Sequence, residues 1–315
     1  MAGMDEFIQS LPKAELHVHL EGSIAPETLL ELDPSLDADE IRGRYSYRDF
    51  RGFLDAYKWV VGRLRTPADY ALITRRLLER LAGEGVVHAE LNFSAGVVFW
   101  RNQDLDAMFD AVAAEAEDQP VSALFIFDAV RQFGVDAAWA VARAAAKHAP
   151  RGVAAFGIGG DEQAIPMAEF RPVIDFVKAA GLRFVPHAGE AAGPEAVRDA
   201  VGHGADRIGH GIAAAQDDGL MELLRERDIP LEVCVSSNIC TGVVASMEEH
   251  PLRRLWDAGV PVVLNSDDPP MFQTTLAGEY RVAARHFGFT AEMLSRAAAN
   301  SLGYSFSPRY RTSVR

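Results

Sequence analysis

Two histidines stand two positions apart in the stretch Leu16-His17-Val18-His19-Leu20-Glu21-Gly22. In a β-strand, alternate side chains point to the same face, so this spacing would present both imidazoles on one side. Two nitrogens on one face can bind a single metal ion, an arrangement that a helix offers only at a spacing of three or four. Taken alone, the pair is equally consistent with a polar strand, so its meaning depends on the rest of the chain.

Short apolar runs recur along the chain, with segments of helical periodicity between them. The strands we expect are Ala14–His19, Val86–Phe93, Ser122–Val130, Val153–Ile158, Arg183–His187, Arg207–His210, Leu231–Val235 and Val262–Asn265. The helices we expect include Tyr70–Ala82, Leu105–Glu117, Asp136–Lys147, Phe170–Ala180, Glu195–Val201, Leu220–Arg227 and Pro251–Ala258. Eight strands alternating with helices imply a parallel sheet, and in 315 residues this number favours an α/β fold of the (β/α)₈ TIM-barrel type.

A doubly wound sheet is the alternative architecture. No GxGxxG pattern follows the first expected strand, and the glycines around Gly157-Ile158-Gly159-Gly160 follow the fourth strand and lack that pattern. No low-complexity linker divides the chain. We therefore expect a single domain over residues 1–315.

The stretch from Ala25 to Thr66 is longer than a simple crossover between two strands. It carries aromatic residues at roughly helical spacing, namely Tyr45, Tyr47, Phe50, Phe53, Tyr57 and Trp59. One interpretation is a set of extra helices that pack on one another. The other is a lid whose aromatic side chains cover a flat ligand at the mouth of the barrel, and the two interpretations are compatible.

Composition narrows the classes of partner. The net charge of −14 argues against nucleic acid or an anionic membrane as the main partner. The first ten residues lack an apolar stretch of signal-peptide length, and no segment reaches membrane-spanning length. Two cysteines, Cys234 and Cys240, are too few for a disulfide framework, so a reducing cytoplasm is the simplest compartment. Nothing in the sequence indicates an oligomeric state.

Polar residues cluster where the expected strands end. His17 and His19 close the first strand, His187 the fifth and His210 the sixth, and Asp267 follows the eighth. In a barrel these ends converge on the face that carries the chemistry. Imidazole nitrogens from His17, His19 and His187 with a carboxylate from Asp267 suit Zn²⁺, although Fe²⁺, Co²⁺ or Mn²⁺ could bind a similar set. The fourth strand has no lysine that could be carbamylated to bridge two ions, so we expect one ion.

Three further polar residues have catalytic or substrate-binding interpretations. Glu190, three residues beyond His187, could shuttle a proton or, alternatively, orient His187. His210 could hold or deprotonate the attacking water, although a lone histidine at a strand end is often a packing residue. Asp268 faces away from its neighbour Asp267 if both lie on a strand, and is better placed to face the substrate.

Other apparent signals do not form complete motifs. His88-Ala89-Glu90 resembles the H-x-E of small nucleobase deaminases, but the P-C-x-x-C partner is missing because Cys234 and Cys240 are too far apart. No H-E-x-x-H sequence occurs, which excludes a zincin-type protease. We expect the two cysteines to be core or loop thiols. The remaining histidines lie in helical or loop segments and are expected at the surface or in packing: His148, His203, His250 and His286.

In combination, these motifs resemble the adenosine/adenine deaminase family of the amidohydrolase superfamily. The resemblance begins with the stretch from Leu11 to Ser23 that contains the two histidines and extends to residue 270. It continues in the family's order through Gly160-Asp161-Glu162, His187-Ala188-Gly189-Glu190, Gly209-His210-Gly211, Ser236-Ser237-Asn238 and Asn265-Ser266-Asp267-Asp268-Pro269.

The resemblance implies a zinc-dependent hydrolytic deamination at C6 of an adenine ring, with release of ammonia. His17, His19, His187 and Asp267 would bind Zn²⁺, and Glu190 would protonate N1. His210 and Asp267 would orient and deprotonate the attacking water. For substrate binding, Asp268 would contact N7 and the Gly160 N–H would contact N3, with His19 and Glu21 also at the substrate.

Departures from the family pattern leave the substrate open within the purine class. Adenosine deaminases usually have Asp at the position of Glu21, and Glu is frequent in adenine-specific relatives and in enzymes acting on 5′-modified nucleosides. The stretch Cys234-Val235-Ser236-Ser237-Asn238 is closer to the nucleoside enzymes. The expected substrate is an adenine nucleoside, either adenosine or a 5′-modified analogue such as 6-aminodeoxyfutalosine. Free adenine is the alternative.

Overall fold

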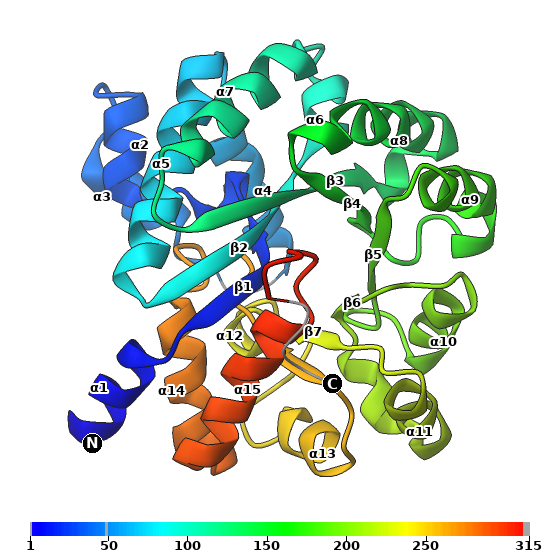
Figure 1. Ribbon diagram of the computed structural model, residues 1–315. Coiled ribbons are helices and arrows are strands. Elements are labelled where there is room, and N and C mark those ends of the chain that lie inside the picture. The colour runs from blue at the N-terminus through cyan, green and yellow to red at the C-terminus, as the bar shows by residue number, and fades with distance from the viewer. Residues whose placement is uncertain (1, 48–49, 311–315) are drawn as a thin grey trace.

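Eight parallel strands form a barrel surrounded by helices in the computed structural model, which describes residues 2–47 and 50–310 (Figure 1). Strands that follow one another in the chain are also neighbours in the sheet, so the order runs from β1 to β8. The expected barrel is confirmed. The strands are β1 (Lys13–His19), β2 (Val86–Phe93), β3 (Ser122–Val130), β4 (Val153–Gly159), β5 (Arg183–Ala188), β6 (Ile208–His210), β7 (Leu231–Val233) and β8 (Val262–Leu264).

The seam between β8 and β1 is closed by residues of the predicted site. Val18 and Asp267 form a parallel bridge, in which the Asp267 N–H donates to the His17 carbonyl at 3.0 Å. The Asp267 carbonyl in turn accepts the His19 N–H at 2.9 Å. Lower in the seam, Asn265 Oδ1 accepts the Leu16 N–H. The backbone of Asp267 is therefore held against the two-histidine stretch by the closure of the barrel.

Amphipathic helices cover the outside of the barrel, and α5 (Pro67–Gly83) shows why they form. Thr66 and Asp69 build a capping box at its start, and Pro67 occupies the first turn. Its buried residues recur at helical spacing, with Tyr70 and Leu77 completely inaccessible to solvent. The other helices of this layer are α7 (Leu105–Glu117), α8 (Val135–His148), α9 (Arg171–Ala179), α10 (Pro194–Gly202), α11 (Asp218–Glu226), α13 (Leu252–Asp257), α14 (Leu276–Phe287) and α15 (Ala291–Gly303).

The expected boundaries are accurate for the long elements and less so for the short ones. Strands β2 and β3 and helix α7 begin and end at the expected residues. Strand β7 ends two residues early because the chain enters the short helix α12 (Val235–Cys240). Five helices had no expected counterpart: α1 (Ala2–Ser10), α6 (Ala95–Trp100), α12, α14 and α15.

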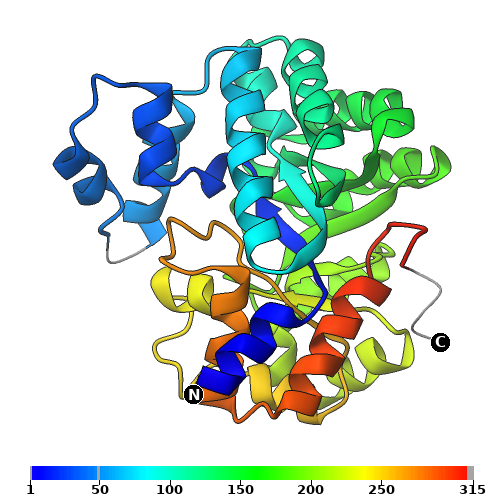
Figure 2. The same cartoon turned by 60° about the vertical axis from the view of Figure 1, so that its left-hand side comes forward.

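Three helices between β1 and β2 form the segment for which a lid was expected: α2 (Pro26–Leu32), α3 (Ala38–Arg44) and α4 (Phe50–Val61). Figure 2 shows α2 and α3 (blue) set to one side of the barrel. The Tyr57 hydroxyl lies 3.0 Å from the Ser94 Oγ atom beyond β2, and the Phe53 ring packs on Phe272 beyond β8. The side chain of Phe50 lies outside the described residues. The segment thus packs on the carboxyl ends of the strands, which is where the lid interpretation places it.

A buried ionic cluster fills the barrel beneath its carboxyl-terminal face. Arg207 donates from Nε to Glu232 at 2.5 Å and from its terminal nitrogen to Glu90 at 2.6 Å. The Phe306 ring, in the segment after α15, lies 3.9 Å from the guanidinium. Because all three charged groups are buried, each charge needs the others as partners. Among the described residues, none of the helices is long and apolar enough to cross a membrane.

Candidate metal centre and active site

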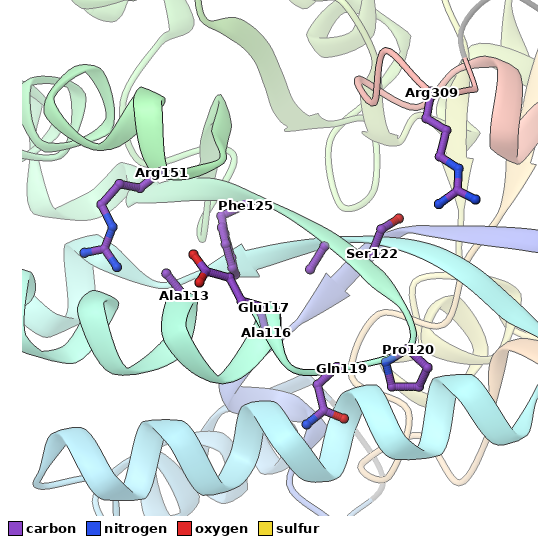
Figure 3. A pocket seen from close by; sticks show the side chains of 10 residues that line it. Ala113, Ala116, Glu117, Gln119, Pro120, Ser122, Phe125, Arg151 and Arg309 are labelled. Carbon is purple, nitrogen blue, oxygen red and sulfur yellow. The ribbon is translucent and has the colours of Figure 1, made fainter.

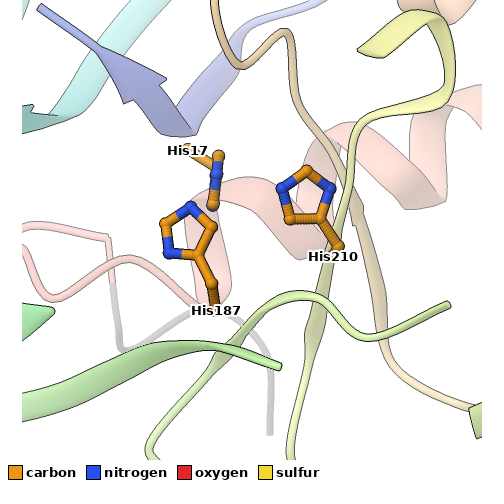
Figure 4. Close-up of side chains that lie close together, drawn as sticks. All are labelled: His17, His187 and His210. Carbon is orange, nitrogen blue, oxygen red and sulfur yellow. The ribbon is translucent and has the colours of Figure 1, made fainter. Parts of the chain in front are cut away.

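Four histidine rings meet at the carboxyl ends of β1, β5 and β6. The ring centre of His17 lies 5.4 Å from His19, 4.7 Å from His187 and 5.0 Å from His210. Figure 4 shows the rings of His17, His187 and His210 turned toward one another. The expectation that His17 and His19 share one face of the first strand is therefore confirmed.

His17 is prepared to bind a cation through one nitrogen. Its Nδ1 lies 2.7 Å from Glu232 Oε2, whereas its Nε2 is buried without a hydrogen-bond partner. An imidazole that donates its Nδ1–H to a carboxylate keeps its lone pair on Nε2, the arrangement usual for metal-binding histidines. Glu232 had no role in the sequence-based expectations, although its position on β7 places it inside the barrel.

Asp267 lies among the histidine nitrogens. Its Oδ1 atom is 3.7 Å from His17 Nε2 and 3.4 Å from His19 Nε2, and its Oδ2 atom is 3.8 Å from His210 Nε2. These separations are longer than ordinary hydrogen bonds. Both Asp267 and His210 have left-handed backbones, with φ of 63° and 58°. Such conformations are uncommon for residues other than glycine and concentrate at functional sites.

The donor atoms fit a cation. Nitrogens of His17, His187 and His210 lie within 4.8 Å of one another, and so do the donor atoms of His17, His19 and Asp267. The four predicted ligands thus fall into two overlapping groups that share His17. His187 Nδ1 is also buried without a partner. Burial lowers the pKa of His19 to about 4 and holds that of His187 well below its usual value, which keeps the rings in the neutral form that metals require.

Cys234 shares a third group with His210 and Asp267. Burial raises the pKa of its thiol well above the usual value, and Asp267 adds to the effect. A cysteine binds metal as the thiolate, so this environment disfavours it as a ligand. The structure agrees with the expectation of a core thiol.

Glu190 lies beside the histidines, with its Oε2 atom 3.6 Å from His210 Nε2. Burial raises the pKa of its carboxyl group to about 8, and the negative charge of Asp267 adds to this shift. A carboxyl group with this pKa retains its proton at neutral pH and can act as a general acid.

Glu162 holds the loop that carries Glu190. Its carboxylate accepts the backbone N–H groups of Gly189 at 2.6 Å, Glu190 at 2.9 Å and Ala191 at 2.9 Å. Successive N–H groups that converge on one carboxylate fix the path of the loop. Glu162 belongs to a motif that the sequence analysis quoted, but no role was assigned to it there.

The side chain of Asp268 lies against Gly22, just beyond β1. Its Oδ1 atom is buried without a partner, and a Cβ atom on Gly22 would lie only 1.4 Å from it. Burial raises the pKa of Asp268 well above its usual value, and Asp267 reinforces the shift. Burial alone would raise the pKa of Asp267, but it is held well below its usual value by the neighbouring His17, whose own pKa Asp267 and Glu232 hold well above its usual value. The pKa values of the two neighbouring carboxyl groups are therefore shifted in opposite directions.

Glu21 and Gly160 lie at the ends of β1 and β4. Glu21 Oε1 accepts the Ser94 N–H at 3.0 Å, while its Oε2 is buried without a partner, and burial raises its pKa to about 7. Gly160 has a φ of 91°. A Cβ atom on its neighbour Gly159 would lie 3.3 Å from His187 Nδ1, which places this turn beside the histidines.

His250 and Asn238 extend the site behind His210. Asn238 Nδ2 lies 3.1 Å from His210 Nδ1, and Asn238 Oδ1 lies 3.1 Å from His250 Nε2. The expectation of a surface or packing role for His250 misses this contact, since the side chain is buried and hydrogen-bonded. His250 follows a loop after α12, and its distance in the sequence from His210 gave no signal of their proximity.

A separate groove of about 450 Å³ lies elsewhere, between α7, the start of β3 and the C-terminal segment (Figure 3). Its charged lining residues are Glu117, Arg151 and Arg309. Because β3 begins there, the groove is at the amino-terminal end of the barrel, opposite the histidines. None of the predicted site residues lines it.

Comparisons with known proteins give a consistent family. The model of the family described as adenosine deaminase matches residues 12–313. An aminodeoxyfutalosine deaminase from Streptomyces coelicolor is 42% identical, covering 95% of this chain and 81% of its own length. An adenine deaminase from Sinorhizobium medicae is 37% identical, covering 94% of each chain.

Solved structures agree. The adenine deaminase from Arthrobacter aurescens superposes with a TM-score of 0.89 at 31% identity, covering 96% of each chain. An amidohydrolase from Burkholderia ambifaria, whose structure contains bound zinc, superposes with a TM-score of 0.89 at 26% identity, covering 98% of this chain and 89% of its own.

Proposed function

The chain belongs to the adenosine deaminase family, and from this premise we propose that it is a metal-dependent purine deaminase that acts on an adenine nucleoside. The reaction replaces the exocyclic amino group at C6 with oxygen from water and releases ammonia. It is a hydrolysis of a cyclic amidine C–N bond. The preferred substrate that we propose carries an extended 5′ substituent, as in 6-aminodeoxyfutalosine.

The observation that carries the proposal is the position of two carboxyl groups at the histidine cluster: Glu190 lies beside His210, and Asp268 directly follows Asp267. The ring nitrogens of adenine accept hydrogen bonds, so a site for adenine must offer donors. Burial raises the pKa of Glu190 to about 8 and shifts the pKa of Asp268 in the same direction, which favours the protonated forms that can donate. Glu190 would protonate N1 and Asp268 would donate to N7, with the Gly160 N–H available to N3.

We propose that one Zn²⁺ ion is held by His17, His19, His187 and Asp267. The partnerless nitrogens of His17 and His187 support this set, and so does the zinc in the related amidohydrolase. The absence of a lysine from β4 disfavours a carbamylated bridge to a second ion. When bound, the ion would lower the pKa of water and make a nucleophile available near neutral pH.

Asp267 and Glu190 would carry out the proton transfers of the reaction. Asp267 stays ionised and can accept a proton from the attacking water, while His210 orients the oxygen. Protonation of N1 by Glu190 makes C6 electrophilic and removes part of the aromatic barrier to attack. Asp267 can afterwards pass the proton that it took from water to the departing amino group, so that ammonia leaves as a neutral molecule. The C6 hydroxyl gives its proton to the Glu190 carboxylate as the carbonyl forms, which restores both groups.

Glu21 bears on the choice between substrates. Its Oε2 atom is buried without a partner and would accept a hydrogen bond from a sugar hydroxyl. The Streptomyces relative, at 42% identity, is named for a 5′-modified nucleoside, which supports the substrate we propose. Adenine is the second candidate, supported by the adenine deaminases among the relatives and solved structures.

A spectrophotometric assay tests the proposal. The zinc-loaded protein would be incubated with 6-aminodeoxyfutalosine, adenosine and adenine while the change from the adenine to the hypoxanthine spectrum is followed. We expect the highest kcat/KM with 6-aminodeoxyfutalosine. Turnover of adenine alone would favour the second candidate, and no turnover of any of the three, with zinc confirmed by elemental analysis, would refute the deaminase proposal.

We further propose that the chain acts as a single domain in a reducing cytoplasm. The two cysteines are free, and one apolar core includes residues from Ile8 to Ala298. The negative net charge supports a small-molecule substrate over nucleic acid.

A further inference from the structure

A chain of hydrogen bonds runs from the backbone at Leu252 to the ring of His210. The Leu252 N–H donates to His250 Nδ1 at 3.2 Å. His250 Nε2 lies 3.1 Å from Asn238 Oδ1, and Asn238 Nδ2 lies 3.1 Å from His210 Nδ1. All three side chains are buried, with exposures of 4% for His250, 0% for Asn238 and 1% for His210. Because these side chains are buried, an unpaired donor or acceptor in this series of hydrogen bonds would reduce the stability of the fold.

The backbone N–H of Leu252 determines which atom donates and which accepts in each of these hydrogen bonds. A backbone N–H can only donate, so His250 Nδ1 must accept and a neutral His250 carries its proton on Nε2. That proton is donated to Asn238 Oδ1. Burial lowers the pKa of His250 to about 4, which agrees with the neutral ring.

The opposite orientation of the Asn238 amide would place two donors against each other. If the Asn238 amide were turned, its nitrogen would face His250 Nε2, and that atom would have to accept. The proton of His250 would then move to Nδ1, where it would meet the Leu252 N–H. The amide is therefore held with its nitrogen toward His210, and His210 Nδ1 must accept because an amide nitrogen can only donate.

We propose that Asn238 and His250 are positioning residues that hold the proton of His210 on Nε2, the nitrogen that faces Glu190 and Asp267. Nε2 is 3.6 Å from Glu190 Oε2 and 3.8 Å from Asp267 Oδ2, and so it faces the reacting groups. A nitrogen that carries a proton has no lone pair for a metal ion. Although His210 lies within reach of His17 and His187, it is thereby excluded as a ligand through Nε2.

The catalytic consequence rests on the proposed function. With its proton on Nε2, His210 acts toward the attacking water as a hydrogen-bond donor, which orients the oxygen without removing a proton from it. Asp267 is then the acceptor of that proton. Without the hydrogen bonds from Asn238 and His250, the His210 ring could carry its proton on Nδ1. Its Nε2 atom would then present a lone pair to the site instead of a donor.

Nitrogen NMR tests the tautomer directly and requires no turnover. The zinc-loaded protein would be labelled with ¹⁵N-histidine, and the His210 signals among the nine histidines would be assigned by comparison with His210→Gln. We expect His210 and His250 each to be protonated on Nε2 and unprotonated on Nδ1. A proton on Nδ1 of His210 would overturn the proposal, whether or not the protein proves to be a deaminase.

Asn238→Asp gives a sharper form of the same test. A carboxylate offers only acceptors, so His210 Nδ1 should become protonated in this variant. Asn300→Asp is the matched control, because Asn300 lies on α15 and donates to the Val262 carbonyl. The control should leave the His210 signals unchanged. An unprotonated His210 Nδ1 in folded Asn238→Asp would contradict the proposal.

Kinetics of His250 variants test the consequence if Asn238→Asp fails to fold. We expect His250→Leu to lower kcat by about 10- to 100-fold, with little change in KM and full zinc content. His250→Gln can still donate to Asn238 and should recover much of this loss. His203→Leu, at the end of α10, controls for the removal of a histidine. Equal kcat values for His250→Leu and the unaltered protein, or equal losses in the Leu and Gln variants, would overturn the positioning role.

Discussion

Glu232 Oε2 lies 2.7 Å from His17 Nδ1, and this contact links the histidine cluster to the ionic cluster inside the barrel. The other oxygen of Glu232 binds Arg207, which also binds Glu90. The orientation of His17 therefore depends on charged groups that lie outside the proposed set of metal ligands. Such indirect partners fix the tautomer of a metal-binding histidine and increase its basicity.

Replacing Glu232 with Gln should weaken zinc binding. Gln has one acceptor in place of two, so it cannot serve both Arg207 and His17 as the carboxylate does. We expect the affinity for zinc to fall by about 10- to 100-fold, measured by competition with a chromogenic chelator. Glu226→Gln, on the exposed face of α11, is the control. Unchanged affinity in a folded Glu232→Gln protein, checked by circular dichroism, would show that Glu232 does not orient His17.

Replacing Glu190 with Gln should abolish nearly all turnover and leave the zinc content intact. Gln cannot donate a proton to N1, yet it preserves the size of the side chain. Single-turnover assays and elemental analysis measure the two effects. Loss of zinc from the variant would instead assign Glu190 a structural role at the metal centre.

The pH dependence of kcat/KM should reflect the same carboxyl group. Burial raises the pKa of Glu190 to about 8, so the acid form, which donates the proton, predominates below that pH. We expect kcat/KM to fall tenfold per pH unit above about 8. A profile with no decrease above pH 8 would contradict the assignment of Glu190 as the acid.

The raised pKa of Glu190 also makes the free energy of unfolding depend on pH. In the metal-free protein Glu190 retains a proton that the unfolded chain, with a pKa of 4.5, releases. Its contribution to the free energy of unfolding therefore falls as pH rises from 4.5 toward 8. Glu190→Gln should remove this decrease, so the variant should gain stability relative to the unaltered protein as pH rises. Parallel denaturant titrations at several pH values would measure it, and a gain that is independent of pH would contradict the argument.

The barrel and the convergence of the candidate ligands could be predicted from the sequence because both depend on local patterns. Alternation in Ala14–His19 placed two imidazoles on one face, and strand ends such as His187 and Asp267 converge in any parallel barrel. Glu232 and His250 could not be placed in this way. Their partners, His17 and Asn238, are reached only through the closed barrel or across a loop, and no spacing in the chain encodes those contacts.

Replacing Gly22 with Ala should damage substrate binding without removing the metal. The added Cβ would lie 1.4 Å from Asp268 Oδ1, so the carboxyl group that is proposed to contact N7 must move. We expect KM to rise by at least about tenfold, because a lost hydrogen bond of this kind is worth about 1.5 kcal/mol or more. Gly43→Ala on α3, where an added Cβ meets nothing within 4 Å, is the control. An unchanged KM would argue against Asp268 as a substrate contact.

Replacing Glu162 with Gln should loosen the loop from Gly189 to Ala191. The carboxylate accepts three backbone N–H groups, and one of its two oxygens becomes a donor in Gln. Hydrogen exchange of these amides should become faster, and kcat should fall by about tenfold as Glu190 loses its fixed position. Unaltered exchange rates would show that the loop is held by other contacts.

Replacing Glu21 with Ala should separate nucleoside from free-base activity. Its Oε2 atom is buried without a partner, and a sugar hydroxyl of the substrate would complete its hydrogen bonding, whereas adenine has no such group. We expect kcat/KM for 6-aminodeoxyfutalosine and adenosine to fall by about 10- to 100-fold, since a hydrogen bond to a charged group is worth about 1.5–3 kcal/mol. The value for adenine should stay within about twofold of that of the unaltered protein, because the contacts to the ring are untouched. An equal loss on all three substrates would mean that Glu21 supports the site as a whole, through its bond to the Ser94 N–H, and does not select the sugar.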